Sequence, residues 1–151
     1  MKIALLYGTE TGNAEILCED IESNLSADHE VTVTNMEDTE PGALNGDAFH
    51  IFVCSTYGEG ELPQSAIEFV DTMKADQTDL SAVSFSIFGL GDTSYDDTYN
   101  QGSQVLMDAL LAAKAKMIGP RGIHDASGFD APEEVAMPWV EERITEAAKI
   151  F

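Results

Sequence analysis

The chain has 151 residues, of which 28 are acidic and 7 basic, so its formal net charge at pH 7 is −21. This length favours a single domain over residues 1–151 with a sizeable hydrophobic core. The charge excludes nucleic acid as a partner, because its phosphates would be repelled. It suits docking to basic protein surfaces or solvation in a salty cytoplasm, and the sequence leaves both explanations open.

The two cysteines indicate a reducing compartment. Cys18 and Cys54 are far apart and lack the CxxC spacing of redox and metal sites. The apolar run at the N-terminus is too short to cross a membrane and is not followed by a signal-peptide pattern. We therefore expect a soluble cytoplasmic monomer without a metal site or a membrane partner.

Five apolar runs predict β-strands, and helical patterns separate them. The strands are expected at Ile3–Tyr7, Val31–Asn35, Ala48–Cys54, Val83–Gly89 and, with a weaker pattern, Lys116–Pro120. Helices are expected at Ala14–Leu25, Ser65–Lys74, Gln101–Lys114 and Glu133–Ile150, with only a short helix within Met36–Asp47. In the first helix, Ile16, Leu17, Ile21 and Leu25 fall near one face.

Strands that alternate with helices predict an α/β fold: a parallel sheet between two layers of helices. Five strands suit the doubly wound order 2-1-3-4-5. In that order the ligand site lies beyond the carboxyl ends of the strands, at the switch point between the first and third strands. The loops that follow the first, third and fourth strands should therefore meet.

The first of these loops has the properties of a phosphate site. The strand stops at Gly8, the residues Thr9, Glu10, Thr11, Gly12 and Asn13 follow, and the first helix then begins. A helix N-terminus offers free N–H groups and the positive end of a dipole, and the threonine hydroxyls add donors. The loop has no Lys or Arg, which argues against a nucleoside triphosphate cradle of the P-loop type.

The other two loops combine glycines with an aromatic residue. They read Ser55-Thr56-Tyr57-Gly58-Glu59-Gly60-Glu61-Leu62-Pro63 and Gly89-Leu90-Gly91-Asp92-Thr93-Ser94-Tyr95-Asp96-Asp97. Glycine lets backbone N–H and C=O groups face a ligand, and tyrosine offers a flat surface for stacking. The two loops are expected to flank a slot for a planar ring, whose phosphate the first loop would hold.

These three loops resemble the FMN-binding loops of flavodoxins. The loop sequences are most similar to those of the flavodoxin-like domains of cytochrome P450 reductase and sulfite reductase, and to those of short-chain flavodoxins of the MioC type. The resemblance spans nearly the whole chain, and three motifs in the right order after the right strands make it specific. It implies a flavodoxin-like three-layer sandwich with a five-stranded parallel sheet in the order 2-1-3-4-5.

The resemblance also assigns roles to individual residues. Around the FMN phosphate it places Thr9, Glu10, Thr11, Gly12, Asn13 and Ala14. Around the isoalloxazine ring it places Ser55, Thr56, Tyr57, Gly58, Glu59, Gly60, Leu90, Gly91, Asp92 and Tyr95, with Tyr57 and Tyr95 stacking on its two faces. The family usually has an aromatic residue three positions after the second stacking tyrosine, where this chain has Thr98, so that Tyr99 and Asn100 become the candidates there. Asp125, after the fifth strand, resembles an aspartate that lies near the flavin.

The resemblance implies a stand-alone electron-transfer protein with FMN as cofactor and no catalytic residue of its own. It would receive electrons from a separate reductase, of the flavodoxin or ferredoxin NADP reductase type, and pass them singly to an unidentified acceptor. Acidic residues crowd the predicted slot; they are Glu59, Glu61, Asp92, Asp96 and Asp97. They would either lower the flavin potential and present a negative docking face to a basic redox protein, or form only a solvated rim, and the sequence leaves both explanations open.

The sequence argues against two other functions and leaves a third open. A phosphoacceptor signalling domain needs clustered acids at the ends of the first and third strands, but these strands end in Tyr7-Gly8 and Cys54-Ser55. An NAD(P)H-dependent flavin enzyme of the quinone reductase type would need a nicotinamide site, and none is evident in a 16.3 kDa chain. An FMN-binding regulatory protein stays open on sequence grounds.

Overall fold

The computed structural model describes residues 1–9, 12–56, 61–91 and 101–151. Its strands are β1 (Lys2–Gly8), β2 (Glu30–Asn35), β3 (Phe49–Ser55), β4 (Ser84–Gly91), β5 (Lys116–Met117) and β6 (Gly122–Asp125). Its helices are α1 (Asn13–Leu25), α2 (Gln64–Ala75), α3 (Gln101–Ala112) and α4 (Pro132–Ala147), with short 3-10 turns η1 (Met36–Asp38) and η2 (Pro41–Ala43). The predicted helices and the first four predicted strands are confirmed, with bounds that shift by a few residues, whereas the fifth strand differs from the prediction.

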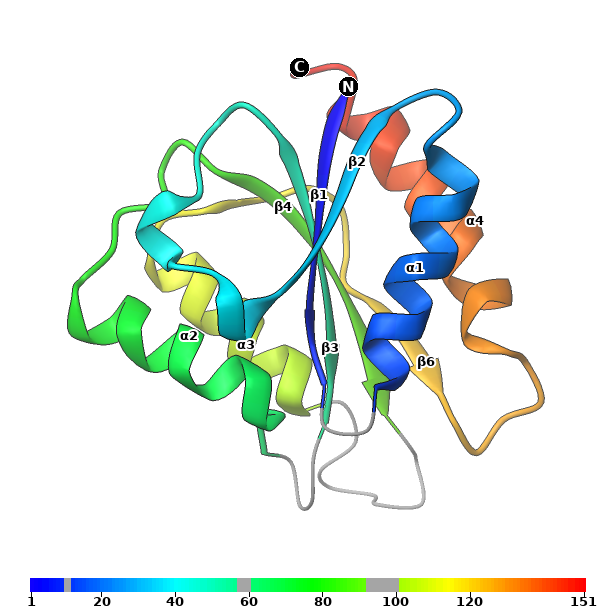
Figure 1. The fold of residues 1–151 in the computed structure, drawn as a ribbon, viewed down its shortest axis with the longest axis horizontal. Helices are drawn as coiled ribbons and strands as arrows, with labels where there is room; N and C mark the ends of the chain where they lie inside the picture. Colours follow the sequence, from blue (N-terminus) through cyan, green and yellow to red (C-terminus); the bar gives the residue numbers. More distant parts are fainter. Residues whose placement is uncertain (10–11, 57–60, 92–100) are drawn as a thin grey trace.

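The strands form one parallel sheet with the order β2-β1-β3-β4-β5, as predicted, and β6 also pairs with β4. Helices α1 and α4 cover one face of this sheet, and α2 and α3 cover the other (Figure 1). The termini lie at the edge where the strands begin, and β1, β3 and β4 all run toward the opposite edge (Figure 1). The fold is therefore the three-layer α/β sandwich that the sequence predicts.

Each central strand divides its side chains between two hydrophobic cores. In β3, Ile51 and Val53 belong to the core under α1 and α4, whereas Phe52 and Cys54 belong to the core under α2 and α3. All four side chains have no exposed surface. A strand that is apolar on both faces is typical of a parallel sheet covered by helices on both sides, and this rigid centre fixes where β3 ends.

The first helix departs from prediction at one position. Leu17, Ile21 and Leu25 are buried as expected, but the Ile16 side chain is 58% exposed. Adjacent residues on a helix point about 100° apart, so Leu17 occupies the centre of the buried stripe and Ile16 lies beyond its margin. The prediction that Ile16 lies near the same face as the other three was therefore wrong.

The fifth predicted strand is interrupted. The prediction placed it at Lys116–Pro120, but β5 ends at Met117 and a second short strand, β6, pairs with β4 from Gly122 onward. Gly119 has a φ of +70°, outside the extended region, and Pro120 has no N–H with which to continue the ladder. These two residues bend the chain out of the sheet between β5 and β6.

Helix α4 fixes the segment between β5 and β6 through hydrogen bonds to Pro120. The indole Nε1 of Trp139 donates a hydrogen bond of 3.1 Å to the carbonyl oxygen of Pro120, and Nη1 of Arg143 donates one of 3.4 Å to the same atom. Arg143 is buried, and its Nη2 pairs with Oε1 of Glu146 at 2.6 Å. Because the Trp139 ring also packs on Phe88 of β4, at 5.3 Å between centroids, α4 fixes the position of β6 relative to the sheet.

Candidate functional site

The carboxyl ends of three central strands and of β6 lie side by side at one edge of the sheet. In the strand register, Gly8 of β1 is level with Cys54 of β3, Ser55 with Leu90 of β4, and Gly91 with Asp125 of β6. The described part of the chain thus brings the starting points of the predicted ligand loops together at the switch point between β1 and β3 (Figure 1).

The turn that leaves β1 is held from two sides. The Thr9 N–H donates to Oγ of Ser65 at 2.8 Å, and that hydroxyl donates back to the Thr9 carbonyl at 3.2 Å. Within the loop, Oγ1 of Thr9 accepts a hydrogen bond of 2.8 Å from the Gly12 N–H. Gly12 has a φ of +94°, a left-handed conformation that glycine adopts without strain. Thr9 is therefore fixed to α2 on one side and to the start of α1 on the other.

The N-terminus of α1 has backbone N–H groups that can donate hydrogen bonds to a ligand. Its N-cap, Gly12, makes no side-chain cap hydrogen bond, and Asn13 and Ala14 occupy its first turn, where N–H groups have no partner within the helix. The acidic residue of that turn, Glu15, acts on Tyr7: burial raises the pKa of the Tyr7 hydroxyl, and the Glu15 carboxylate raises it further. Neutral backbone donors at the positive end of the α1 dipole form a site that suits a phosphate group.

Strands β3 and β4 are joined to α3 just beyond Ser55. The Thr56 N–H donates a hydrogen bond of 3.1 Å to the Leu90 carbonyl, and Oγ1 of Thr56 accepts one of 3.0 Å from the Gly102 N–H. At Gly102 the backbones approach closely: a Cβ there would lie 2.5 Å from the Ser55 carbonyl oxygen and 2.9 Å from Cα of Thr56. The predicted site residues Ser55, Thr56 and Leu90 thus form one hydrogen-bonded unit with the start of α3.

Asp125 lies at the end of β6, level with Gly91, and its carboxylate is engaged by its own loop. Oδ1 of Asp125 accepts hydrogen bonds from the N–H of Ser127 at 2.9 Å and from the Ser127 hydroxyl at 2.7 Å. The Ala126 N–H donates to the Gly91 carbonyl at 2.8 Å, which extends the pairing of β6 with β4. Asp125 therefore lies at the predicted edge, with one carboxylate oxygen ordering the turn that follows.

The structure thus places Thr9, Gly12, Asn13, Ala14, Ser55, Thr56, Leu90, Gly91 and Asp125 at one edge. The remaining predicted site residues lie outside the described residues, and their roles stay predictions: Glu10, Thr11, Tyr57, Gly58, Glu59, Gly60, Asp92, Tyr95, Tyr99 and Asn100.

Two residues that support the site were missed by the sequence prediction. Ser65 fixes Thr9 to α2, and Gly102 lets α3 approach the end of β3. Each is the second residue of its helix, where serine and glycine are not unusual, so nothing in the sequence indicates a contact with a distant strand. In each case the partner is more than 40 residues away.

The described residues contain no group of three or more His, Cys, Asp or Glu side chains placed to hold a metal ion. None of the helices in this part of the chain is long and apolar enough to cross a membrane. Cys54, at the end of β3, is fully buried, and burial raises the pKa of its thiol to about 12. A thiol held in its neutral form is a poor nucleophile, so Cys54 acts in packing.

Comparison with known proteins now identifies the family, because the family model described as Flavodoxin matches residues 5–139. The chain belongs to the flavodoxin family. Flavodoxins are flavin-binding electron-transfer proteins, and flavodoxin YqcA of Escherichia coli K12 is 32% identical to this chain over 143 residues, which cover 93% of this chain and 95% of that protein. Among solved structures, oxidised flavodoxin 2 of Bacillus cereus aligns with a TM-score of 0.80 at 27% identity over 99% of both chains.

Other relatives of this flavodoxin are much longer proteins. NADPH-dependent diflavin oxidoreductase 1 of Aspergillus fumigatus is 35% identical over 91% of this chain, which spans 23% of that protein. The flavoprotein alpha-component of the Bacillus subtilis NADPH sulfite reductase is 33% identical over 93% of this chain, again spanning 23% of its length. The chain therefore corresponds to about a quarter of these reductases.

Proposed function

We propose that this flavodoxin binds FMN at the carboxyl edge of its sheet and carries single electrons between a separate reductase and an acceptor protein. The observation that carries the proposal is the meeting of the β1, β3 and β4 ends at the switch point of a flavodoxin fold, next to a helix N-terminus with neutral donors. The lack of a Lys or Arg in the first loop suits the single terminal phosphate of a mononucleotide.

When bound, the flavin supplies the redox chemistry, and the protein binds, orients and tunes it. The N–H groups of Asn13 and Ala14 would hold the phosphate. The hydrogen-bonded unit of Ser55, Thr56 and Leu90 fixes the carboxyl ends of β3 and β4, from which the second and third predicted loops start. Because Thr56 is hydrogen-bonded to both β4 and α3, this unit needs little reorganisation when the cofactor binds.

The distribution of charge supports a basic redox partner at the same edge. Every lysine of the chain lies where strands begin or helices end, at the opposite edge of the sheet: Lys2, Lys74, Lys114, Lys116 and Lys149. Arg121 donates to Oγ of Ser103 at 2.8 Å, and Arg143 is buried in α4. The three predicted ligand loops contribute acidic residues and no Lys or Arg. The negative end of the molecule therefore faces the direction from which a basic partner would approach.

Purified protein reconstituted with FMN tests the proposal directly. We expect flavin absorbance close to one FMN per chain and quenching of FMN fluorescence on titration with the apoprotein. Replacing Tyr95 with Ala should weaken FMN binding, by an amount set by stacking energies of about 1–3 kcal/mol, whereas Tyr95→Phe keeps the ring and should retain most of the affinity.

Two results would count against the proposal. A colourless protein that cannot be reconstituted with FMN would remove the cofactor, and rapid NADPH oxidation by the isolated chain would favour a flavin enzyme in place of a carrier. Equal FMN affinity in the Tyr95→Ala and Tyr95→Phe variants would remove only the stacking role of that side chain.

A further inference from the structure

The segment between β6 and α4, residues 126–131, is ordered by hydrogen bonds on both sides of its tip. Before the tip, Asp125 accepts from the Ser127 N–H at 2.9 Å and its carbonyl accepts from the Gly128 N–H at 3.0 Å. After the tip, Nε2 of His124 lies 2.7 Å from the carbonyl oxygen of Asp130, which acts as the acceptor. The backbone on either side of residue 129 is thus tied to the end of β6.

The residue at this tip is a fully exposed phenylalanine. The side chain of Phe129 is 108% exposed, which is the highest value among the exposed large apolar side chains of the described residues. A free aromatic side chain in water gives up the stabilisation that burial would provide. The hydrogen bonds order the backbone on both sides of Phe129, while the phenylalanine side chain itself is left exposed to solvent.

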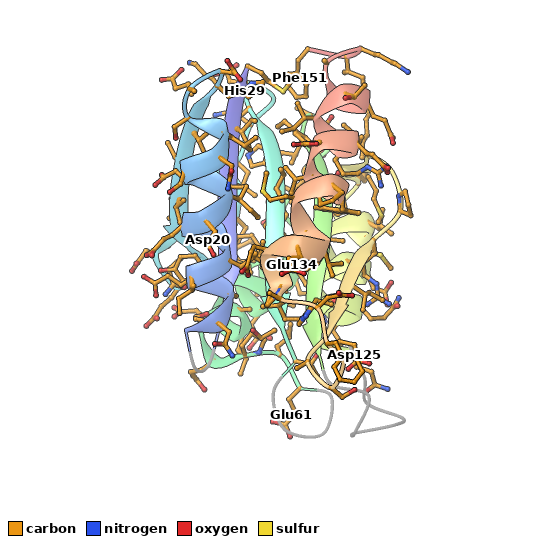
Figure 2. All side chains as sticks on the ribbon, turned by 90° about the vertical axis from the view of Figure 1, so that its right-hand side faces the viewer. Asp20, His29, Glu61, Asp125, Glu134 and Phe151 are labelled. Carbon is orange, nitrogen blue, oxygen red and sulfur yellow. The ribbon has the colours of Figure 1, made fainter. Side chains whose placement is uncertain are left out.

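We propose that Phe129 is an apolar docking anchor for the redox partner, a deepening of the proposed function on which it rests. The loop leaves the carboxyl end of β6, level with Gly91, and therefore belongs to the edge at which the cofactor is proposed to bind. Figure 2 shows Asp125, at the start of this loop, and Glu61 together at that end of the molecule, with Phe151 and His29 at the other. Ile16, on the first turn of α1, is a second exposed apolar side chain at this edge.

The charges around Phe129 define the partner. Asp130 follows it directly in the loop, Asp125 ends the strand before the loop, and Glu133 and Glu134 lie on the first turn of α4. An exposed aromatic side chain with four acidic residues within five positions of it along the chain matches a protein surface that has an apolar recess bordered by Lys and Arg. Aromatic anchors contribute most when a rigid backbone presents them, because little conformational entropy is then lost on binding. The partner inferred here is a basic redox protein with such a recess beside its redox centre.

The test measures binding to cytochrome c, a basic redox protein, by isothermal titration calorimetry at several salt concentrations. Phe129→Ser should weaken binding about three- to tenfold, and the factor should persist as salt rises, since no charge changes. Phe129→Leu should recover most of the affinity. Ile150→Ser is the matched control, because Ile150 is 65% exposed and lies beyond the end of α4, at the opposite edge; it should leave binding unchanged.

Equal affinity of the Phe129→Ser variant and the unmodified protein would overturn the proposal. A concentration-dependent dimer of the unmodified protein that the same variant abolishes would also overturn it, by making a second copy of the chain the occupant. Calorimetry measures binding of cytochrome c whether or not electrons are transferred, so it tests the role of Phe129 separately from the proposed function. Failure to bind FMN would therefore refute the proposed function, whereas an unchanged cytochrome c affinity with FMN bound would refute the role of Phe129 alone.

Discussion

Replacing Gly102 with Ala tests whether the contact between α3 and the end of β3 organises the candidate site. The new Cβ would lie 2.5 Å from the Ser55 carbonyl oxygen, 2.9 Å from Cα of Thr56 and 3.0 Å from Oγ1 of Thr56. Two of these atoms are backbone and cannot swing aside, so α3 must move away from β3. That movement strains the hydrogen bond from Gly102 to Thr56.

Helix propensity and overpacking act in opposite directions on the free energy of unfolding of the Gly102→Ala protein. Ala is favoured over Gly in a helix by up to about 1 kcal/mol, because it restricts the unfolded chain. Overpacking typically costs about 1–3 kcal/mol, and a weakened hydrogen bond adds about 0.5–1.5 kcal/mol. The net loss in the free energy of unfolding should be about 1–3 kcal/mol. For a chain of this length that lowers the melting temperature by roughly 2–4 °C per kcal/mol.

Thermal and urea unfolding of the apoprotein measure this loss, and FMN titration shows whether the site is disturbed as well. Gly42→Ala is the matched control, since a Cβ at Gly42 meets nothing within 4 Å; its unfolding free energy should stay equal or rise. A Gly102→Ala protein as stable as the Gly42→Ala protein, with unchanged FMN affinity, would refute the reasoning.

Three further predictions concern other residues. Gly12→Ala forces a Cβ into a left-handed turn with no neighbour within 4 Å, so it should cost about 1–2 kcal/mol of unfolding free energy through backbone strain alone, with Gly12→Asn costing less in the same urea titration. Burial lowers the pKa of His50, so the unfolded state binds more protons and unfolding free energy should fall as pH drops below about 6.5; a His50→Gln protein that keeps the same pH dependence would contradict this. Burial raises the pKa of the thiols of Cys18 and Cys54, so neither should react with a thiol reagent at about pH 8 until guanidinium chloride unfolds the chain.

The strand order could be predicted from the sequence because the apolar runs and the loops between them carry periodic, local signals. Ile51 and Val53 on one face of β3, and Phe52 and Cys54 on the other, read as one continuous apolar run. Such a run is the expected pattern of a strand covered on both sides. The exposure of Ile16 was not predicted, because it depends on how α1 is rotated against the sheet.

The supporting contacts of the site could not be predicted in the same way. Ser65 is bonded to Thr9 and Gly102 to Thr56, and both pairs join elements that meet only after the sheet has formed. The interruption after β5 has a local cause in Gly119 and Pro120. Its position against α4, however, depends on Trp139 and Arg143, which the pattern indicated only as part of a helix.

The interruption between β5 and β6 also bears on how the protein behaves in concentrated solution. An edge strand with a continuous row of free N–H and C=O groups invites a strand from another chain to pair with it. Here that row is broken: Pro120 has no N–H, and its carbonyl already accepts hydrogen bonds from Trp139 and Arg143. β5 is only two residues long. The bend between β5 and β6 therefore keeps a strand of another chain from extending the sheet at this edge.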